Sequence, residues 1–122
     1  MASKQEVLKY LQENYNHEDL GDDSLKIVME AEDSDRSQLV YAFVYDGVLS
    51  LASPFARTDQ ISDVQAFSKF SLFGKDKLSD FYVLRHVVLL ENVDDNEIVE
   101  AMRYLASAAD EFEDQLGLGD NL

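Results

Sequence analysis

The chain has 122 residues, and its 25 aspartates and glutamates against 10 lysines and arginines give a formal net charge of −15 at pH 7. Phosphate backbones and anionic lipids repel so acidic a surface, so we expect neither nucleic acid nor a membrane as a partner. The absence of cysteine excludes disulfides and thiolate-bound metals.

The first predicted element is a helix that begins at a capping box. Ser3 and Glu6 have the spacing at which each side chain accepts a hydrogen bond from the other residue's backbone N–H. The apolar residues that follow recur on one helical face: Val7, Leu8, Leu11 and Tyr15. We expect this helix to end near residues 14–16, and a polar, acidic loop to occupy residues 17–24.

Three strands are predicted next. Residues 25–32 alternate between apolar and polar side chains, which is typical of a half-buried strand. Residues 39–45 are apolar on both faces, as in a strand at the centre of a sheet. Asp46-Gly47 is a strong hairpin signal that joins this strand to a third, over residues 48–52. We expect Pro54 to end the third strand, because proline cannot donate to a strand ladder.

A second helix is predicted over residues 60–73, before Gly74, and apolar residues cover more than one of its sides. One stripe on this helix consists of Val64, Phe67, Phe70 and Phe73. Two interpretations are open: the stripe covers the sheet, or a second apolar side forms a two-fold dimer interface. The residues of that possible interface are Ile61, Leu72 and Phe73.

Two short strands or one bent hairpin are predicted after the second helix. Lys75-Asp76-Lys77 is expected to form a loop. Residues 80–84 and 86–91 have the composition of strands, and Arg85 would lie near the turn between them.

The last helix is the longest predicted element and begins with residues 93–96. Its apolar residues are spaced alternately by four and three: Ile98, Met102, Leu105, Ala109, Phe112 and Leu116. Gly117 and Gly119 should end it. Most of its acidic residues are expected on the solvated outer face.

The element order is therefore helix, three strands, helix, two strands, helix. This order predicts an α+β fold in which three helices gather on one face of an antiparallel sheet of about five strands. A hydrophobic content of 46% over this length is typical of one globular unit, so we expect residues 1–122 to form a single domain.

The element order and the last third of the sequence resemble one known family. Leu84-Arg85-His86 and the closing pattern Ala109-Asp110-x-x-Glu113-x-x-Leu116, followed by Gly119-Asp120, are similar to the YbjN-like family. The resemblance implies the fold of type III secretion chaperones, a homodimer and no enzymatic activity. Val87 and Leu89 stand where the family commonly has a small residue and a proline, so no functional residue is carried over.

Candidate sites for chemistry are few. Asp33-x-Asp35-x-Ser37 looks like the start of a calcium loop, but Gln38 replaces the required glycine and Val44 the acid at the twelfth position. His86 has no nucleophile motif beside it, and His17 belongs to a polar stretch. We therefore expect no catalytic residue, no cofactor and no metal site, and a protein that is not an enzyme.

The sequence favours binding over catalysis. The first hypothesis is a cytoplasmic, dimeric, chaperone-like module that holds a segment of a partner protein by strand addition and side-chain pockets. The alternative is a dimeric regulatory protein, related to signalling or stress, whose ligand is unknown. A cytoplasmic location fits the polar amino terminus and the lack of any run approaching the ~18 apolar residues that a membrane span needs.

Overall fold

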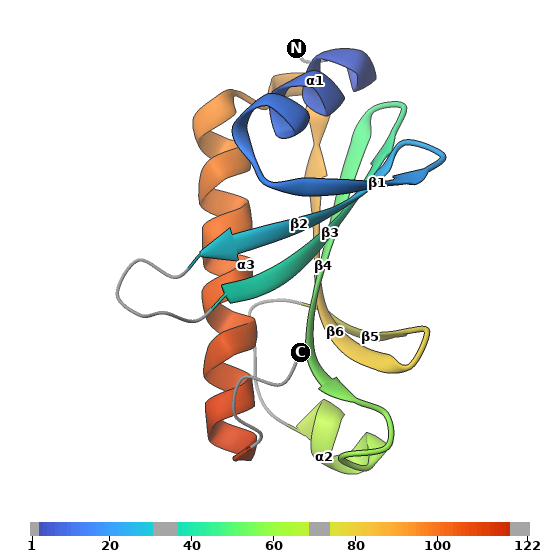
Figure 1. Ribbon diagram of the computed structural model, residues 1–122, viewed down its shortest axis with the longest axis vertical. Helices are drawn as coiled ribbons and strands as arrows, with labels where there is room; N and C mark the ends of the chain where they lie inside the picture. Colours follow the sequence, from blue (N-terminus) through green and yellow to red (C-terminus); the bar gives the residue numbers. More distant parts are fainter. Residues whose placement is uncertain (1–2, 31–36, 69–73, 118–122) are drawn as a thin grey trace.

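A computed structural model describes residues 3–30, 37–68 and 74–117 (Figure 1). Its sheet has six antiparallel strands in the order β1-β2-β3-β4-β6-β5. The elements in chain order are α1 (Lys4–Asn14), β1 (His17–Gly21), β2 (Ser24–Glu30), β3 (Ser37–Tyr45), β4 (Val48–Arg57), α2 (Asp63–Ser68), β5 (Gly74–Leu78), β6 (Phe81–Leu89), a 3-10 turn (Leu90–Asn92) and α3 (Asp95–Leu116). The prediction of an α+β fold with three helices is confirmed, with one strand more than expected.

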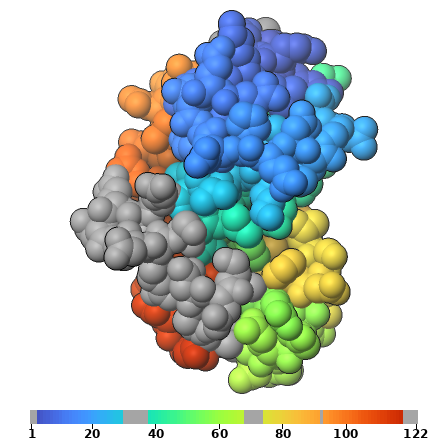
Figure 2. Space-filling view, in the orientation of Figure 1, coloured from blue at the N-terminus to red at the C-terminus, as the bar shows by residue number. Residues whose placement is uncertain are grey.

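The helices gather on one face of the sheet. α3 runs along this face against β3, β4 and β6, and α1 packs against β3 near one end (Figure 1). α2 lies at the opposite end of the molecule from α1, as the space-filling view also shows (Figure 2). It reaches the same face, where the Phe67 and Tyr82 rings meet edge to face with centroids 5.6 Å apart.

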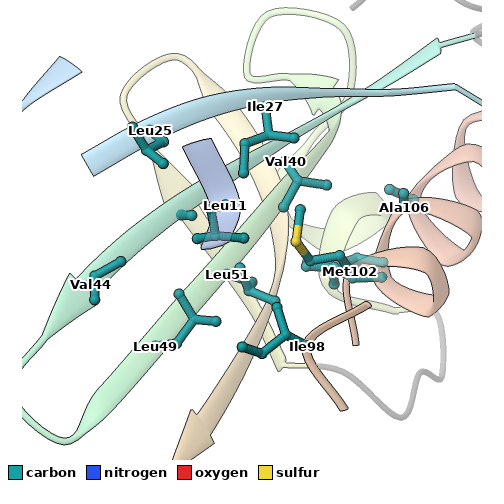
Figure 3. Packing of buried hydrophobic residues seen from close by; sticks show 14 of the residues in the cluster. Leu11, Leu25, Ile27, Val40, Val44, Leu49, Leu51, Ile98, Met102 and Ala106 are labelled. Carbon is teal, nitrogen blue, oxygen red and sulfur yellow. The ribbon is translucent and has the colours of Figure 1, made fainter. Parts of the chain in front are cut away.

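The core lies between α3 and the inward side chains of the strands (Figure 3). Leu49 and Leu51 of β4 pair with Val88 and His86 of β6, and alternation along the strands turns these positions towards α3. The large side chains that are almost completely buried include Leu11, Leu25, Ile27, Leu49, Leu51, Phe55, Leu84, Ile98, Met102 and Leu105. Burying each such side chain contributes about 1.5–3 kcal/mol to folding.

The terminal helices form where the sequence predicts them. The capping box of Ser3 and Glu6 starts α1, with N–H to oxygen distances of 3.2 and 3.3 Å. At α3, the Asp94 carboxylate accepts the Glu97 N–H at 2.8 Å, and Gly117 ends the helix with a φ of 73°. The predicted apolar seam is confirmed from Ile98 through Phe112, which are buried, and Leu116 packs partly against the core.

One acidic residue of α3 departs from the expected solvated face. Glu113 is completely buried. It follows Ala109 by four residues and precedes Leu116 by three, so it lies on the inward side of the helix.

β4 continues through Pro54, where the sequence analysis expected it to end. The pairing of β4 with β3 stops at Ala52, and beyond it β4 pairs only with β6, with a register shift between Pro54 and Ala56. Proline is tolerated here because Pro54 lies at this register shift, and because β3 no longer pairs with β4 at this position.

A buried amide bridges the gap where β3 and β4 separate. Gln38 of β3 is only 6% exposed, and its Nε2 donates to Pro54 O at 2.7 Å and to Ser53 Oγ at 3.3 Å. The Ser53 hydroxyl in turn donates to Leu39 O at 2.7 Å. These side chains supply the hydrogen bonds that the backbone ladder no longer makes.

The predicted loop at Lys75-Asp76-Lys77 and the predicted turn at Arg85 are wrong. Those three residues lie within β5, and Arg85 lies in the middle of β6, opposite Gly74 and Ala52. The turn between these strands falls at residues 79 and 80, where Ser79 has a φ of 55°. β5 carries alternating charges and no apolar alternation, so its local sequence does not indicate a strand. It is a strand because it pairs with β6, which the local sequence cannot show.

Candidate protein-binding surfaces

β1 is the first candidate surface, because it is an edge strand with every residue exposed. The predicted loop over residues 17–24 is therefore wrong, because residues 17–21 form β1 and Ser24 begins β2. β1 and β2 are joined by a two-residue turn, Asp22-Asp23, in which both φ angles are positive, at 53° and 61°. This is the backbone of a hairpin turn that usually carries Asn-Gly or Asp-Gly, so the sequence signal was weak.

The free side of β1 presents backbone groups at two residues. Val28 donates its N–H to Asn16 O at 3.1 Å, and His17 pairs with Ile27 directly after this bond. In an antiparallel pair, hydrogen-bonded and non-hydrogen-bonded positions alternate. The N–H and C=O groups of His17 and Asp19 therefore point away from β2, as strand addition requires.

The surroundings of β1 are strongly acidic. Between Lys9 and Lys26 the sequence has no lysine or arginine and five acids: Glu13, Glu18, Asp19, Asp22 and Asp23. Asp23 is paired with Lys4 at 2.6 Å, and Lys9 lies 3.9 Å from Glu13. Glu18, Asp19 and Asp22 are all exposed, which makes this edge attractive to cationic side chains.

The opposite edge, β5, has charges that are engaged within the chain. Lys77 lies 2.9 Å from Asp63, Asp76 lies 3.4 Å from Arg85, and the Lys75 ammonium lies 5.0 Å from the centre of the Phe112 ring. Burial against this ring lowers the pKa of Lys75. The charges of β5 are thus already neutralised within the chain, whereas β1 and the turn after it have the exposed acids Glu18 and Asp22, so β1 is the edge that would attract a charged segment.

The aspartate of α2 fastens this helix to the β5–β6 hairpin. The Tyr82 hydroxyl donates a hydrogen bond to the Asp63 carboxylate, which also accepts the Lys77 ammonium. The hydrogen bond from Tyr82, followed by the contact with Lys77, lowers the pKa of Asp63 below its usual value. The same hydrogen bond and burial raise the pKa of Tyr82.

The second candidate surface is the sheet face away from the helices. We call it the open-face patch and define it by nine outward positions on three neighbouring strands. Cross-strand pairing aligns them in rows. The rows are Tyr45, Val48 and Leu89; Phe43, Ser50 and Val87; and Tyr41, Ala52 and Arg85.

Large apolar side chains of the open-face patch are exposed. Leu89 is 68% exposed, Tyr45 54% and Val87 52%. Single exposed apolar residues are ordinary, but these three belong to one contiguous set. Arg85 is anchored within the patch, because its Nη1 donates to Ser50 Oγ at 3.1 Å.

The predicted interface on the second helix is only partly described. Ile61 is half-buried and packs against the core, whereas Leu72 and Phe73 lie outside the described residues, as does Phe70. Val64 is 78% exposed, and Phe67 is 44% exposed although its ring meets Tyr82 of β6, so the described part of the stripe contacts the sheet through Phe67 and not through Val64. Among residues 63–67 of α2, Ala66 is the one that the core buries.

The other sequence candidates fall into separate places. His17 begins β1 with its Nδ1 3.0 Å from Tyr15 O, and His86 is half-buried in β6. Asp33 and Asp35 lie outside the described residues, and Ser37 begins β3.

Over residues 3–30, 37–68 and 74–117, no three histidine, cysteine or acidic side chains gather closely enough to hold a metal ion. Among the helices in the described part of the chain, none has the length and apolar character that a membrane span needs. Neither a scan against protein-family models nor a search of curated proteins matched this chain.

Proposed function

We propose that this chain is a non-catalytic protein-binding module that holds an extended, basic segment of a partner protein as an added strand at β1. The observation that carries the proposal is the edge itself: five exposed residues, with outward backbone groups at His17 and Asp19 and acids around them. Main-chain hydrogen bonds would give affinity, and the acidic side chains would select the partner.

Charge distinguishes a foreign partner from a second copy at this edge. Two β1 strands placed side by side would bring Glu18 and Asp19 of one copy close to those of the other, and facing like charges destabilise a strand pair. A segment with lysine or arginine would instead be attracted, and its rate of encounter would rise with the negative charge of the whole chain.

The resemblance to the YbjN-like family supports this proposal. Secretion chaperones with that fold are similarly small, acidic and cytoplasmic, and they hold an extended segment of a partner. A cytoplasmic location and a homodimer are therefore parts of the proposal. The regulatory alternative would gain from a chain that dimerises but binds no extended segment.

The proposal is tested by calorimetric titration with two synthetic ten-residue peptides, one alternating lysine with valine and one alternating glutamate with valine. We expect the basic peptide to bind and the acidic peptide to give no measurable heat of binding. His17→Pro removes an outward N–H and should weaken binding at least about tenfold, because main-chain bonds carry the affinity.

The matched control is His17→Ala, which removes the same side chain but keeps the N–H. It should bind the basic peptide as the unmodified chain does. Equal binding of both peptides, or equal loss in the proline and alanine variants, would contradict strand addition at this edge.

A further inference from the structure

We infer that the open-face patch is where a second copy of this chain docks, so that two sheets pack face to face across a two-fold axis. This inference deepens the dimeric part of the proposed function and is independent of strand addition at β1. A chain that fails to dimerise through the patch can still bind the basic peptide, so the two proposals can fail separately.

The apolar side chains of the open-face patch form one continuous surface. The row of Tyr45, Val48 and Leu89 spans three strands, and the row of Phe43, Ser50 and Val87 lies beside it. The described helices contact the other face of the sheet. In sandwich proteins two sheets pack face to face about 10 Å apart, and rows of this kind are buried between them.

The charge of the patch selects its occupant. None of the nine positions of the open-face patch is acidic and one is Arg85, although acids outnumber lysines and arginines by 25 to 10 in the whole chain. Two copies with a net charge of −15 each repel one another least where they meet through a surface that lacks acids. A basic foreign protein would find no carboxylate on the patch to attract it.

The geometry also keeps the acidic helices of two copies apart. α3 carries seven acids (Asp95, Glu97, Glu100, Asp110, Glu111, Glu113 and Asp114), and it lies on the opposite face of the sheet from the patch. Packing through the patch leaves two sheet layers between the α3 helices, at an axial separation of roughly 30 Å. This separation exceeds the Debye length of about 8 Å at physiological salt, so their repulsion is screened.

The patch is also self-complementary. It carries one guanidinium, at Arg85, and aromatic rings at Tyr41 and Tyr45. Arg85 is already held by Asp76 and Ser50 within its own chain. A two-fold contact would therefore place the tyrosine rings of each copy against the apolar rows of the other.

The size of the patch sets the strength of the contact. Three strands by five residues span roughly 15 by 17 Å, well below the about 800 Å² that each partner buries in a standard interface. We therefore expect a weak, concentration-dependent dimer with a dissociation constant on the order of 100 µM.

The test is sedimentation equilibrium of the full chain from about 1 to 500 µM, a range that brackets this dissociation constant. We compare the unmodified chain with Leu89→Lys, and with Val64→Lys as the matched control on α2. Both substitutions place a lysine at an exposed apolar position, 68% and 78% exposed respectively, and both should leave the fold intact by circular dichroism.

We expect the unmodified chain and Val64→Lys to dimerise alike, and Leu89→Lys to raise the dissociation constant about hundredfold, because a two-fold contact is changed twice. A monomer throughout the range would overturn the inference. So would a dimer that Leu89→Lys leaves intact. A dimer lost only in Val64→Lys would move the interface to α2, where Ile61, Leu72 and Phe73 were expected to form it.

Discussion

At the scale of single residues, polar side chains decide two local features of this sheet. Gln38 spans the place where β3 and β4 separate, and its amide hydrogen bonds replace part of a missing ladder. Asp63 ties α2 to the β5–β6 hairpin through Tyr82 and Lys77. In both cases one side chain joins segments that are distant in sequence.

Gln38→Ala should lower the free energy of unfolding by about 1–3 kcal/mol, because buried groups on Ser53 and Pro54 lose their partner. Urea denaturation followed by circular dichroism measures the change. Gln5→Ala, at an exposed position of α1, is the control and should stay within about 0.5 kcal/mol of the unmodified chain. Equal effects of the two substitutions would mean that the Gln38 hydrogen bonds contribute nothing.

Tyr82→Phe should raise the pKa of Asp63 towards its usual value of 3.8, because the hydroxyl is the largest cause of its lowered pKa. A depressed folded-state pKa gives stability that is fully present above the unfolded-state pKa and is lost as the pH falls through the folded-state pKa. The variant should therefore lose less stability than the unmodified chain below about pH 4. Carbon-detected NMR titration of the Asp63 carboxyl measures the shift, and an unchanged pKa would refute the assignment.

At the scale of elements, what the sequence reveals depends on how local the signal is. The capping box at Ser3, the Asp46-Gly47 hairpin and the spacing from Ile98 to Phe112 all act within a few residues, and each predicts its element correctly. The pairings of β1 with β2 and of β5 with β6 hold strands that are mostly charged or exposed. Such strands show no alternation of apolar and polar residues, so a prediction from the local sequence assigns them to loops.

The end of β4 was mispredicted for a related reason. A proline usually ends a strand, but Pro54 lies beyond the point where β3 has left, and β6 alone continues the pairing. The sequence did not predict the candidate binding edge at β1, because it predicted a loop where β1 lies. The sequence proposes a dimer interface only on an apolar side of the second helix. The open-face patch could not be found in the same way, because three strands assemble it by their register.

Asp94 caps the amino terminus of α3, and its contribution to the stability of the protein can be measured. Asp94→Ala should destabilise the protein by about 1 kcal/mol, because the Glu97 N–H loses its acceptor at the positive end of the helix dipole. Asp94→Asn keeps an acceptor and should cost less. Thermal unfolding by calorimetry measures both. A larger loss in the asparagine variant would show that the hydrogen bond is not what Asp94 contributes.

At the scale of the whole molecule, the fold separates three surfaces by charge. The acidic helix α3 covers one face of the sheet, the acid-free patch occupies the other, and the acidic edge β1 lies along one side (Figure 1). This separation would let one chain meet its own copy through the neutral surface and a basic segment through the acidic edge, without competition between the two events.

Strand addition at β1 can be observed residue by residue through backbone amide hydrogen exchange, resolved by NMR, with and without the basic ten-residue peptide. Strand addition at β1 predicts slower exchange at His17 and Asp19, whose N–H groups point away from β2, and little change at Glu18, whose N–H faces β2. Protection confined to β5 or to α2, or no protection at His17 and Asp19 at saturating peptide, would contradict the account.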